Sequence, residues 1–276
     1  MAAGLHADPR PIGVFDSGVG GLTVLAELRR RLPDESTIYL GDNARAPYGP
    51  RSAEEVRTFT LESVAWLLAQ EVKVLVLACN TATSQALPLV RAVASVPVLG
   101  VVRPGALAAA ASTRAGHVGV IATAGTVASR AYAAAVGEAD PALVVTELAC
   151  PQLVPMVEAG QLSGPVAEAA VRGYLAQLFE ADSKIDTLLL GCTHYPLLRP
   201  LIEHTVGPKV AVVDSAFTTA LAAEDLLDAL GGRTRSVGPG ANRIVTTGDV
   251  ETFAAVAGTV FGAALPSVEH VVVAAD

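Results

Sequence analysis

The chain has 276 residues, of which 51% are hydrophobic and 17% are charged, and this composition excludes an intrinsically disordered protein. The mean hydropathy of +0.47 would suit a membrane protein, but every uncharged stretch of near-spanning length contains polar residues or prolines, so we expect no membrane-spanning helix. The formal net charge is −8 and the basic residues are scattered, which argues against nucleic acid as the primary partner.

A secretion signal begins with basic residues followed by an apolar run, and residues 1–11 do not have this pattern. We therefore expect a cytoplasmic protein. Because the cytoplasm is reducing, we expect the three cysteines to be free thiols.

Short apolar runs alternate along the chain with stretches whose apolar residues recur at helical spacing. Helical stretches include Ser52–Gln70 and Gly164–Phe179. Apolar strands separated by helices predict an α/β fold of mostly parallel sheets with helices on both faces. The predicted strands are Ile12–Phe15, Thr37–Leu40, Val72–Leu77, Val96–Val101, His117–Ile121, Leu143–Glu147, Thr187–Leu190, Lys209–Val213 and Asn242–Thr246.

Two segments of the sequence recur at nearly the same offset. The strand that starts at Ile12 is echoed 106 residues later at Val118, and the segment Val74–Thr81 is echoed 113 residues later by Thr187–His194. These echoes predict two related α/β halves with a cleft between them. We expect a discontinuous first domain, residues 1–103 plus 214–276, and a second domain, residues 104–213.

Cys79 and Cys192 occupy matching places in the two echoing segments, directly after an apolar strand and before a helix start. The carboxyl ends of parallel strands border the ligand site, and a helix N-terminus favours the thiolate, which predicts a pKa below the usual value of about 8.5. A single cysteine at a strand end is more often an inert buried residue. A matched pair facing a cleft suggests instead that one thiol removes a proton from a carbon and the other returns one to the opposite face.

Polar residues at other strand ends are candidates for binding. Asp16 and Ser17 end the first strand and could hold an ammonium group or adjust the protonation of a neighbouring thiol. The glycines that follow do not predict a dinucleotide site, because Thr23 stands where a third glycine would be needed. Tyr48 and Gly49 follow the second strand and could offer a hydroxyl and backbone donors to a carboxylate, although an ordinary turn is an equal alternative.

The remaining chemistry-bearing residues carry weaker signals. His194 could keep the Cys192 thiol reactive or could be a structural residue of a first helical turn. Cys150 has no counterpart in the other half, so we expect it to be a packing residue. Ligand-spaced clusters of His and Cys are absent from the sequence, as is a lysine in a setting suited to pyridoxal phosphate, so we expect neither a metal nor another cofactor. Arg45 is the one basic residue in the strand-end loops, so backbone N–H groups should bind most anionic groups.

Four motifs taken together closely resemble the glutamate racemases. They are Gly13–Thr23, Gly41–Gly49, Ala78–Ala82 and Gly191–Pro196. The resemblance implies a cofactor-independent enzyme of two pseudosymmetric α/β domains that interconverts L- and D-glutamate for peptidoglycan synthesis, and a homodimer. It also implies that Cys192 acts on the L-isomer and Cys79 on the D-isomer.

The resemblance assigns roles to further residues by their place in these motifs. The implied substrate-binding pairs are Asp16-Ser17, Tyr48-Gly49, Asn80-Thr81 and Thr193-His194. Asp16, Asp42, His194 and Glu158 are implied to assist proton transfer.

Three other functions stay open at this point. The first is a racemase of another amino acid such as aspartate. The second is a hydrolase in which Cys192 and His194 form a nucleophile and its base. The third is a binding protein that holds an amino acid without exchanging its Cα proton.

Overall fold

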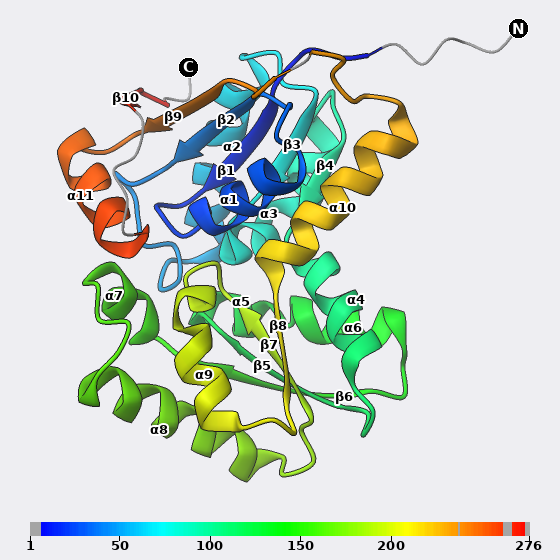
Figure 1. Cartoon of the computed structure of the whole chain (residues 1–276), viewed down its shortest axis with the longest axis vertical. Coiled ribbons are helices and arrows are strands. Elements are labelled where there is room, and N and C mark those ends of the chain that lie inside the picture. Colours follow the sequence, from blue (N-terminus) through cyan, green and yellow to red (C-terminus); the bar gives the residue numbers. More distant parts are fainter. Residues whose placement is uncertain (1–6, 237, 262–266, 274–276) are drawn as a thin grey trace, which may run out of the picture.

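Two parallel β-sheets stacked end to end dominate the computed structural model, which describes residues 7–236, 238–261 and 267–273 (Figure 1). The first sheet has the strand order β10-β9-β2-β1-β3-β4 and the second has the order β6-β5-β7-β8, and every neighbouring pair is parallel. The strands are β1 (Ile12–Asp16), β2 (Thr37–Gly41), β3 (Val74–Leu77), β4 (Val98–Gly100), β5 (His117–Ala122), β6 (Val144–Ala149), β7 (Thr187–Gly191), β8 (Ala211–Asp214), β9 (Asn242–Thr246) and β10 (Val268–His270).

The strand orders confirm the predicted α/β class and account for the echoes in the sequence. The orders β2-β1-β3-β4 and β6-β5-β7-β8 are the same, with the echoing strands β1 and β5 at equivalent places. β9 and β10 extend the first sheet beyond this shared unit. β10 was not predicted, because it is three residues long and Val268–His270 are half-buried or exposed rather than apolar and buried.

Helices cover both faces of each sheet, so the strand side chains alternate between two cores. Ile12 and Val14 of β1 pack with α1 and α10, whereas Phe15 packs with α2 and α3 on the other face. The helices are α1 (Leu22–Arg31), α2 (Ala53–Leu68), α3 (Asn80–Val93), α4 (Val102–Ser112), α5 (Ala124–Ser129), α6 (Ala131–Ala139), α7 (Leu153–Glu158), α8 (Pro165–Ala181), the 3-10 helix η1 (Tyr195–Leu198), α9 (Arg199–Val206), α10 (Ser215–Leu230) and α11 (Val250–Phe261).

The chain passes between the two sheets at two neighbouring points. At the first point β4, a strand of the first sheet, is followed by α4, which packs against α6 and against β7 of the second sheet. At the second point β8, a strand of the second sheet, leads directly into α10, which packs against α1 beside the first sheet. Helix α11 adds a third link, because it packs against α7 beside the second sheet (Figure 1). The division of the chain into domains at residues 103/104 and 213/214 stays a prediction, and its outermost residues, 1–6 and 274–276, lie outside the described residues.

No helix in the described part of the chain is long and apolar enough to cross a membrane. All three cysteines are buried free thiols, as expected.

Candidate active site

A cavity of about 170 Å³ lies between the two sheets, where the carboxyl ends of their strands meet. Every segment that lines it follows a strand, which is where ligands bind in open parallel sheets. The lining residues are Ser17 and Gly18 after β1, Ala46 to Pro50 after β2, Cys79 to Thr81 after β3, Thr123 and Ala124 after β5, Cys150, Pro151, Val154, Pro155 and Glu158 after β6, and Cys192 to His194 after β7.

Cys79 reaches the cavity from the first sheet, at the N-cap of α3. Its Sγ accepts a hydrogen bond from the backbone N–H of Ala82 at 3.4 Å and donates one to Oγ of Ser17 at 3.4 Å. Burial, with a smaller contribution from the nearby Asp16 carboxylate, raises the pKa of Cys79 to about 12. The expectation of a lowered pKa was wrong for this thiol, because loss of hydration outweighs the donors of the helix N-terminus. Cys79 is therefore a neutral thiol at neutral pH.

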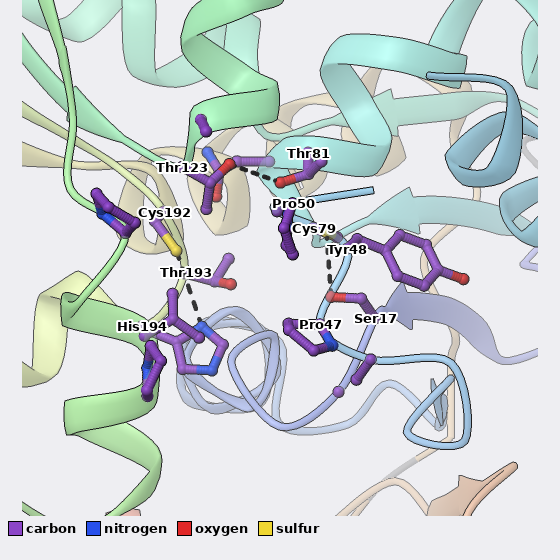
Figure 2. Close-up of a pocket in the computed structure, with 18 of the residues that line it drawn as sticks. Ser17, Pro47, Tyr48, Pro50, Cys79, Thr81, Thr123, Cys192, Thr193 and His194 are labelled. Carbon is purple, nitrogen blue, oxygen red and sulfur yellow. Dashed lines mark hydrogen bonds between the residues drawn. The ribbon is translucent and has the colours of Figure 1, made fainter. Parts of the chain in front are cut away.

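Cys192 reaches the cavity from the second sheet, on the opposite wall (Figure 2). Its Sγ lies 3.8 Å from Nδ1 of His194, and Nε2 of His194 lies 2.9 Å from Oε1 of Glu158. Burial opposes the charge on His194, but the hydrogen bonds to Cys192 and Glu158 outweigh it and raise the pKa of His194 to about 10. The helix start predicted after Cys192 is the 3-10 helix η1, which leads into α9. His194 thus gives Cys192 a cationic neighbour that Cys79 lacks.

Two buried oxygens beside the thiols have no hydrogen-bond partner among the described residues. One is Oδ1 of Asp16, whose other oxygen accepts from the backbone N–H of Gly18 at 2.9 Å. The second is Oδ1 of Asn80, whose amide nitrogen donates to the Tyr132 hydroxyl at 2.6 Å. Burial raises the pKa of Asp16, and Asp16 itself does not line the cavity. Unpaired buried acceptors of this kind suit a ligand with N–H donors.

Hydroxyl groups of both halves meet across the cavity. Oγ1 of Thr81 lies 2.9 Å from Oγ1 of Thr123, and the backbone oxygen of Thr193 accepts from Oγ1 of Thr23 at 3.0 Å (Figure 2 shows the threonine pair). None of the described residues that line the cavity is Lys or Arg. Apart from the Asn80 amide and the His194 imidazolium, hydroxyl and backbone N–H groups are therefore the donors that the described lining residues offer to an anionic ligand.

Tyr48 and Asp42 are placed differently from expectation. The Tyr48 ring points away from the cavity, as Figure 2 shows, and its hydroxyl donates to Oδ2 of Asp42. The expectation that this hydroxyl would face a substrate carboxylate was wrong, because the hydroxyl binds the buried carboxylate of Asp42 instead. Asp42 is fully buried and is absent from the cavity lining.

Several lining residues were missed by the sequence reasoning. Thr123 stands 106 residues after Ser17, so the echo that relates the two halves could have identified it. Cys150 packs in the core of the second half as expected, yet it also lines the cavity. Pro47, Pro50, Pro151 and Pro155 are exposed and lie at the rim, two from each half, where they add apolar surface and no N–H donor.

Comparison with known proteins agrees with this geometry. A family model described as Asp/Glu/Hydantoin racemase matches residues 20–223. A glutamate racemase of Oceanobacillus iheyensis is 50% identical over 252 residues, which cover 91% of this chain and 92% of that protein.

Solved structures of glutamate racemases are also similar to this chain. A glutamate racemase isoform from Bacillus anthracis has a TM-score of 0.90 at 44% identity, covering 95% of this chain and 97% of that one. The glutamate racemase from Francisella tularensis, solved in complex with D-glutamate, has a TM-score of 0.88 at 34% identity, covering 96% and 98% of the two chains. This chain therefore belongs to the Asp/Glu/Hydantoin racemase family, in which its relatives at 44% and 50% identity are glutamate racemases.

Proposed function

We propose that this chain is a glutamate racemase that works without a cofactor and uses Cys79 and Cys192 as its two acid/base groups. The observation that carries the proposal is the placement of these thiols on opposite walls of one buried cavity (Figure 2). Glutamate is supported as the substrate by the relatives, of which the Francisella tularensis enzyme was solved with D-glutamate bound.

The two thiols exchange one proton each with the substrate. Starting from L-glutamate, the Cys192 thiolate removes the Cα proton and the electron pair of that bond stays on Cα. The Cys79 thiol then donates its proton to the opposite face, which leaves a Cys192 thiol, a Cys79 thiolate and D-glutamate. The raised pKa of Cys79, about 12, supports its role as the proton donor in this direction. D-glutamate follows the same steps in reverse.

His194 and Glu158 support the charge changes at Cys192. Because its pKa is raised to about 10, His194 is an imidazolium at neutral pH, and its Nδ1, 3.8 Å from Sγ, stabilises the Cys192 thiolate. Glu158, 2.9 Å from Nε2, stabilises that cation on its other side. Asp16, buried near Cys79 with one oxygen unpaired, is placed to assist at the other thiol.

The substrate's charged groups find complementary atoms around the thiols. The ammonium group carries three donors, and the unpaired Oδ1 of Asn80, which lines the cavity, is a buried acceptor that suits it. The carboxylates are held by Ser17, Thr81, Thr193 and the backbone of Tyr48-Gly49. Such fixed donors in a site with little water stabilise the developing negative charge at Cα and its carboxylate more than water would.

Three further parts of the proposal rest on the family alone. They are a cytoplasmic location, a role in supplying D-glutamate for peptidoglycan, and a homodimeric state. Racemisation of aspartate is the nearest alternative, and comparing turnover of the two amino acids separates them.

One observation favours a second candidate function. Cys192, His194 and Glu158 form a chain of contacts that resembles the nucleophile, base and orienting carboxylate of a cysteine hydrolase. A hydrolase would form an acyl-enzyme on Cys192 and would not need Cys79.

Replacing each cysteine by serine tests the proposal. Cys79→Ser and Cys192→Ser should each lower kcat for racemisation at least about 100-fold, because each removes an acid/base group. Cys150→Ser is the matched control, since its Sγ contacts only the backbone oxygen of Leu148 at 3.7 Å among the hydrogen bonds of the described residues, and a serine hydroxyl can keep that contact. Full activity in Cys79→Ser would contradict the proposal and favour the hydrolase.

A further inference from the structure

The loop between β2 and α2 is held in place by the buried carboxylate of Asp42, which lies outside the cavity lining. Both oxygens of Asp42 accept hydrogen bonds: Oδ2 from the Tyr48 hydroxyl and from Nε of Arg45 at 2.7 Å, and Oδ1 from Oγ1 of Thr247 at 2.6 Å. We call Asp42, Arg45, Tyr48 and Thr247 the Asp42 cluster. Its three donors come from the loop itself and from the end of β9, about 200 residues further along the chain.

The cluster is held firmly against α2. The Arg45 guanidinium also pairs with Glu62 and lies 4.4 Å from the centroid of the Phe59 ring. Tyr48 is 1% exposed, and the centroid of its ring lies 5.9 Å from the centroid of the Phe59 ring and 6.3 Å from that of the Phe15 ring. With both oxygens hydrogen-bonded and its residue fully buried outside the cavity lining, Asp42 does not reach a substrate in the cavity.

The other end of the loop is attached to the second half of the molecule. The backbone oxygen of Gly49 accepts a hydrogen bond from the backbone N–H of Gly125 at 3.0 Å, and the Gly125 oxygen accepts from Nε2 of Gln85 at 2.9 Å. A Cβ on Gly49 would lie 3.2 Å from Cβ of Thr123, so the loop backbone runs close against the opposite wall. The Tyr48-Gly49 backbone is thus held from both sides at the edge of the cavity.

We propose that Asp42 and Thr247 are positioning residues: through the Tyr48 hydroxyl they hold the Tyr48-Gly49 backbone where it binds a substrate carboxylate, and Asp42 does not transfer a proton. This inference rests on the proposed racemisation of glutamate. It replaces the expectation, implied by the family resemblance, that Asp42 assists proton transfer.

The test compares variants that weaken the Asp42 cluster in different ways: Tyr48→Phe and Thr247→Val each remove one hydrogen bond, whereas Asp42→Asn removes the charge and one of the two acceptor oxygens. Tyr48→Phe, Asp42→Asn and Thr247→Val should each raise KM for glutamate about tenfold and change kcat less than about threefold, because a lost bond to a buried charge loosens the loop but leaves both thiols in place. Thr247→Ser keeps the hydroxyl and should restore the KM of the unchanged protein. Asp182→Asn is the control for the Asp-to-Asn change, since Asp182 pairs with His117 far from the cavity.

Two further readouts separate positioning from proton transfer. In the double variant Tyr48→Phe/Asp42→Asn, KM should rise by less than the product of the two single effects, since both substitutions act on the bond between Tyr48 and Asp42. The pH profile of kcat should be unchanged in Asp42→Asn. If kcat falls by orders of magnitude in Asp42→Asn, Asp42 transfers a proton and the inference is overturned. The inference is also overturned if the pH profile of kcat shifts in Asp42→Asn while Tyr48→Phe has normal kinetics. Unchanged KM in Tyr48→Phe and Thr247→Val would overturn it as well.

The outcome for the inference is distinct from the outcome for the proposed function. If the unchanged protein does not racemise glutamate, the proposed function fails before any variant is compared. Calorimetric binding of glutamate then measures the loop separately: weaker binding in Tyr48→Phe and Thr247→Val, with normal binding in Thr247→Ser, supports positioning, and equal binding in all three contradicts it.

Discussion

Nε2 of His194 lies 2.9 Å from Oε1 of Glu158, inside the wall of a cavity that otherwise contains no cation among its described lining residues. The contact fixes which ring nitrogen faces Cys192 and places a carboxylate behind the imidazolium. The two thiols of the site therefore have different surroundings, although they occupy matching places in the two sheets.

This contact predicts a pH dependence of stability. Because the pKa of His194 is raised from its ordinary value of 6.5 to about 10, the folded state binds a proton that the unfolded state releases between these values. The stabilisation from His194 should be fully present below pH 6.5 and should be lost as the pH rises to 10. Urea unfolding of the unchanged protein and of His194→Asn at several pH values should give curves that converge over this range.

The control for this measurement is His204→Asn. His204 is exposed on α9, and its replacement makes the same histidine-to-asparagine change without removing the contact between His194 and Glu158. A constant difference in unfolding free energy between the unchanged protein and His194→Asn from pH 6 to pH 10 would contradict the assigned contact.

A second prediction concerns the close approach of the turn before α1 to His194. A Cβ on Gly20 would lie 2.7 Å from Oγ1 of Thr193 and closer still to the His194 ring, so Gly20→Ala must displace these side chains. We expect a loss of kcat of about 100-fold, since a displacement of about 1 Å in a catalytic group has effects of this size.

Gly137→Ala in α6 is the matched control. A Cβ there meets no other atom within 4 Å, so activity should be retained and the unfolding free energy should rise by about 0.5–1 kcal/mol. Normal kinetics in Gly20→Ala would show that the site tolerates movement of His194.

The third prediction separates stability from activity. Lys73 and Glu35 form a buried ion pair at 2.5 Å, at the amino ends of the strands of the first sheet and therefore at the opposite end from the cavity. Lys73 also donates to the backbone oxygens of Asp8 and Gly232. Lys73→Met should lower the unfolding free energy by about 3–5 kcal/mol, because Glu35 is left as a buried unpaired charge, with kcat unchanged.

Arg30→Gln provides the comparison, because the Arg30–Glu27 pair is largely exposed and such pairs contribute little. If both variants unfold at the same urea concentration as the unchanged protein, the buried pair does not stabilise the first half in the way described.

The positions of Cys79 and Cys192 could be predicted because they depend on strand order, which the sequence repeats. Cys79 and Cys192 follow β3 and β7, which lie at the same place in the two sheets. The same echo relates Ser17 after β1 to Thr123 after β5, and both residues line the cavity. The repeat could therefore have predicted the place of Thr123.

Side-chain direction and protonation could not be predicted in the same way. The Tyr48 ring turns away from the cavity because Asp42 and the aromatic rings of Phe15 and Phe59 surround it, and these contacts come from three separate segments. The pKa of Cys79 rises because the folded chain buries its thiol away from water, which a local helix-start pattern does not reveal. Both features depend on tertiary burial rather than on the local sequence.

The most direct test of the central claim is incubation of the purified, reduced protein with L-glutamate in D2O without added cofactor. Chirality and deuterium content at Cα are followed together. Two-thiol proton transfer predicts D-glutamate that carries solvent deuterium at Cα, because the proton returned to the opposite face comes from a thiol that exchanges with solvent. Absence of both inversion and exchange, with aspartate equally inert, would contradict the assignment of Cys79 and Cys192 as a pair of acid/base groups.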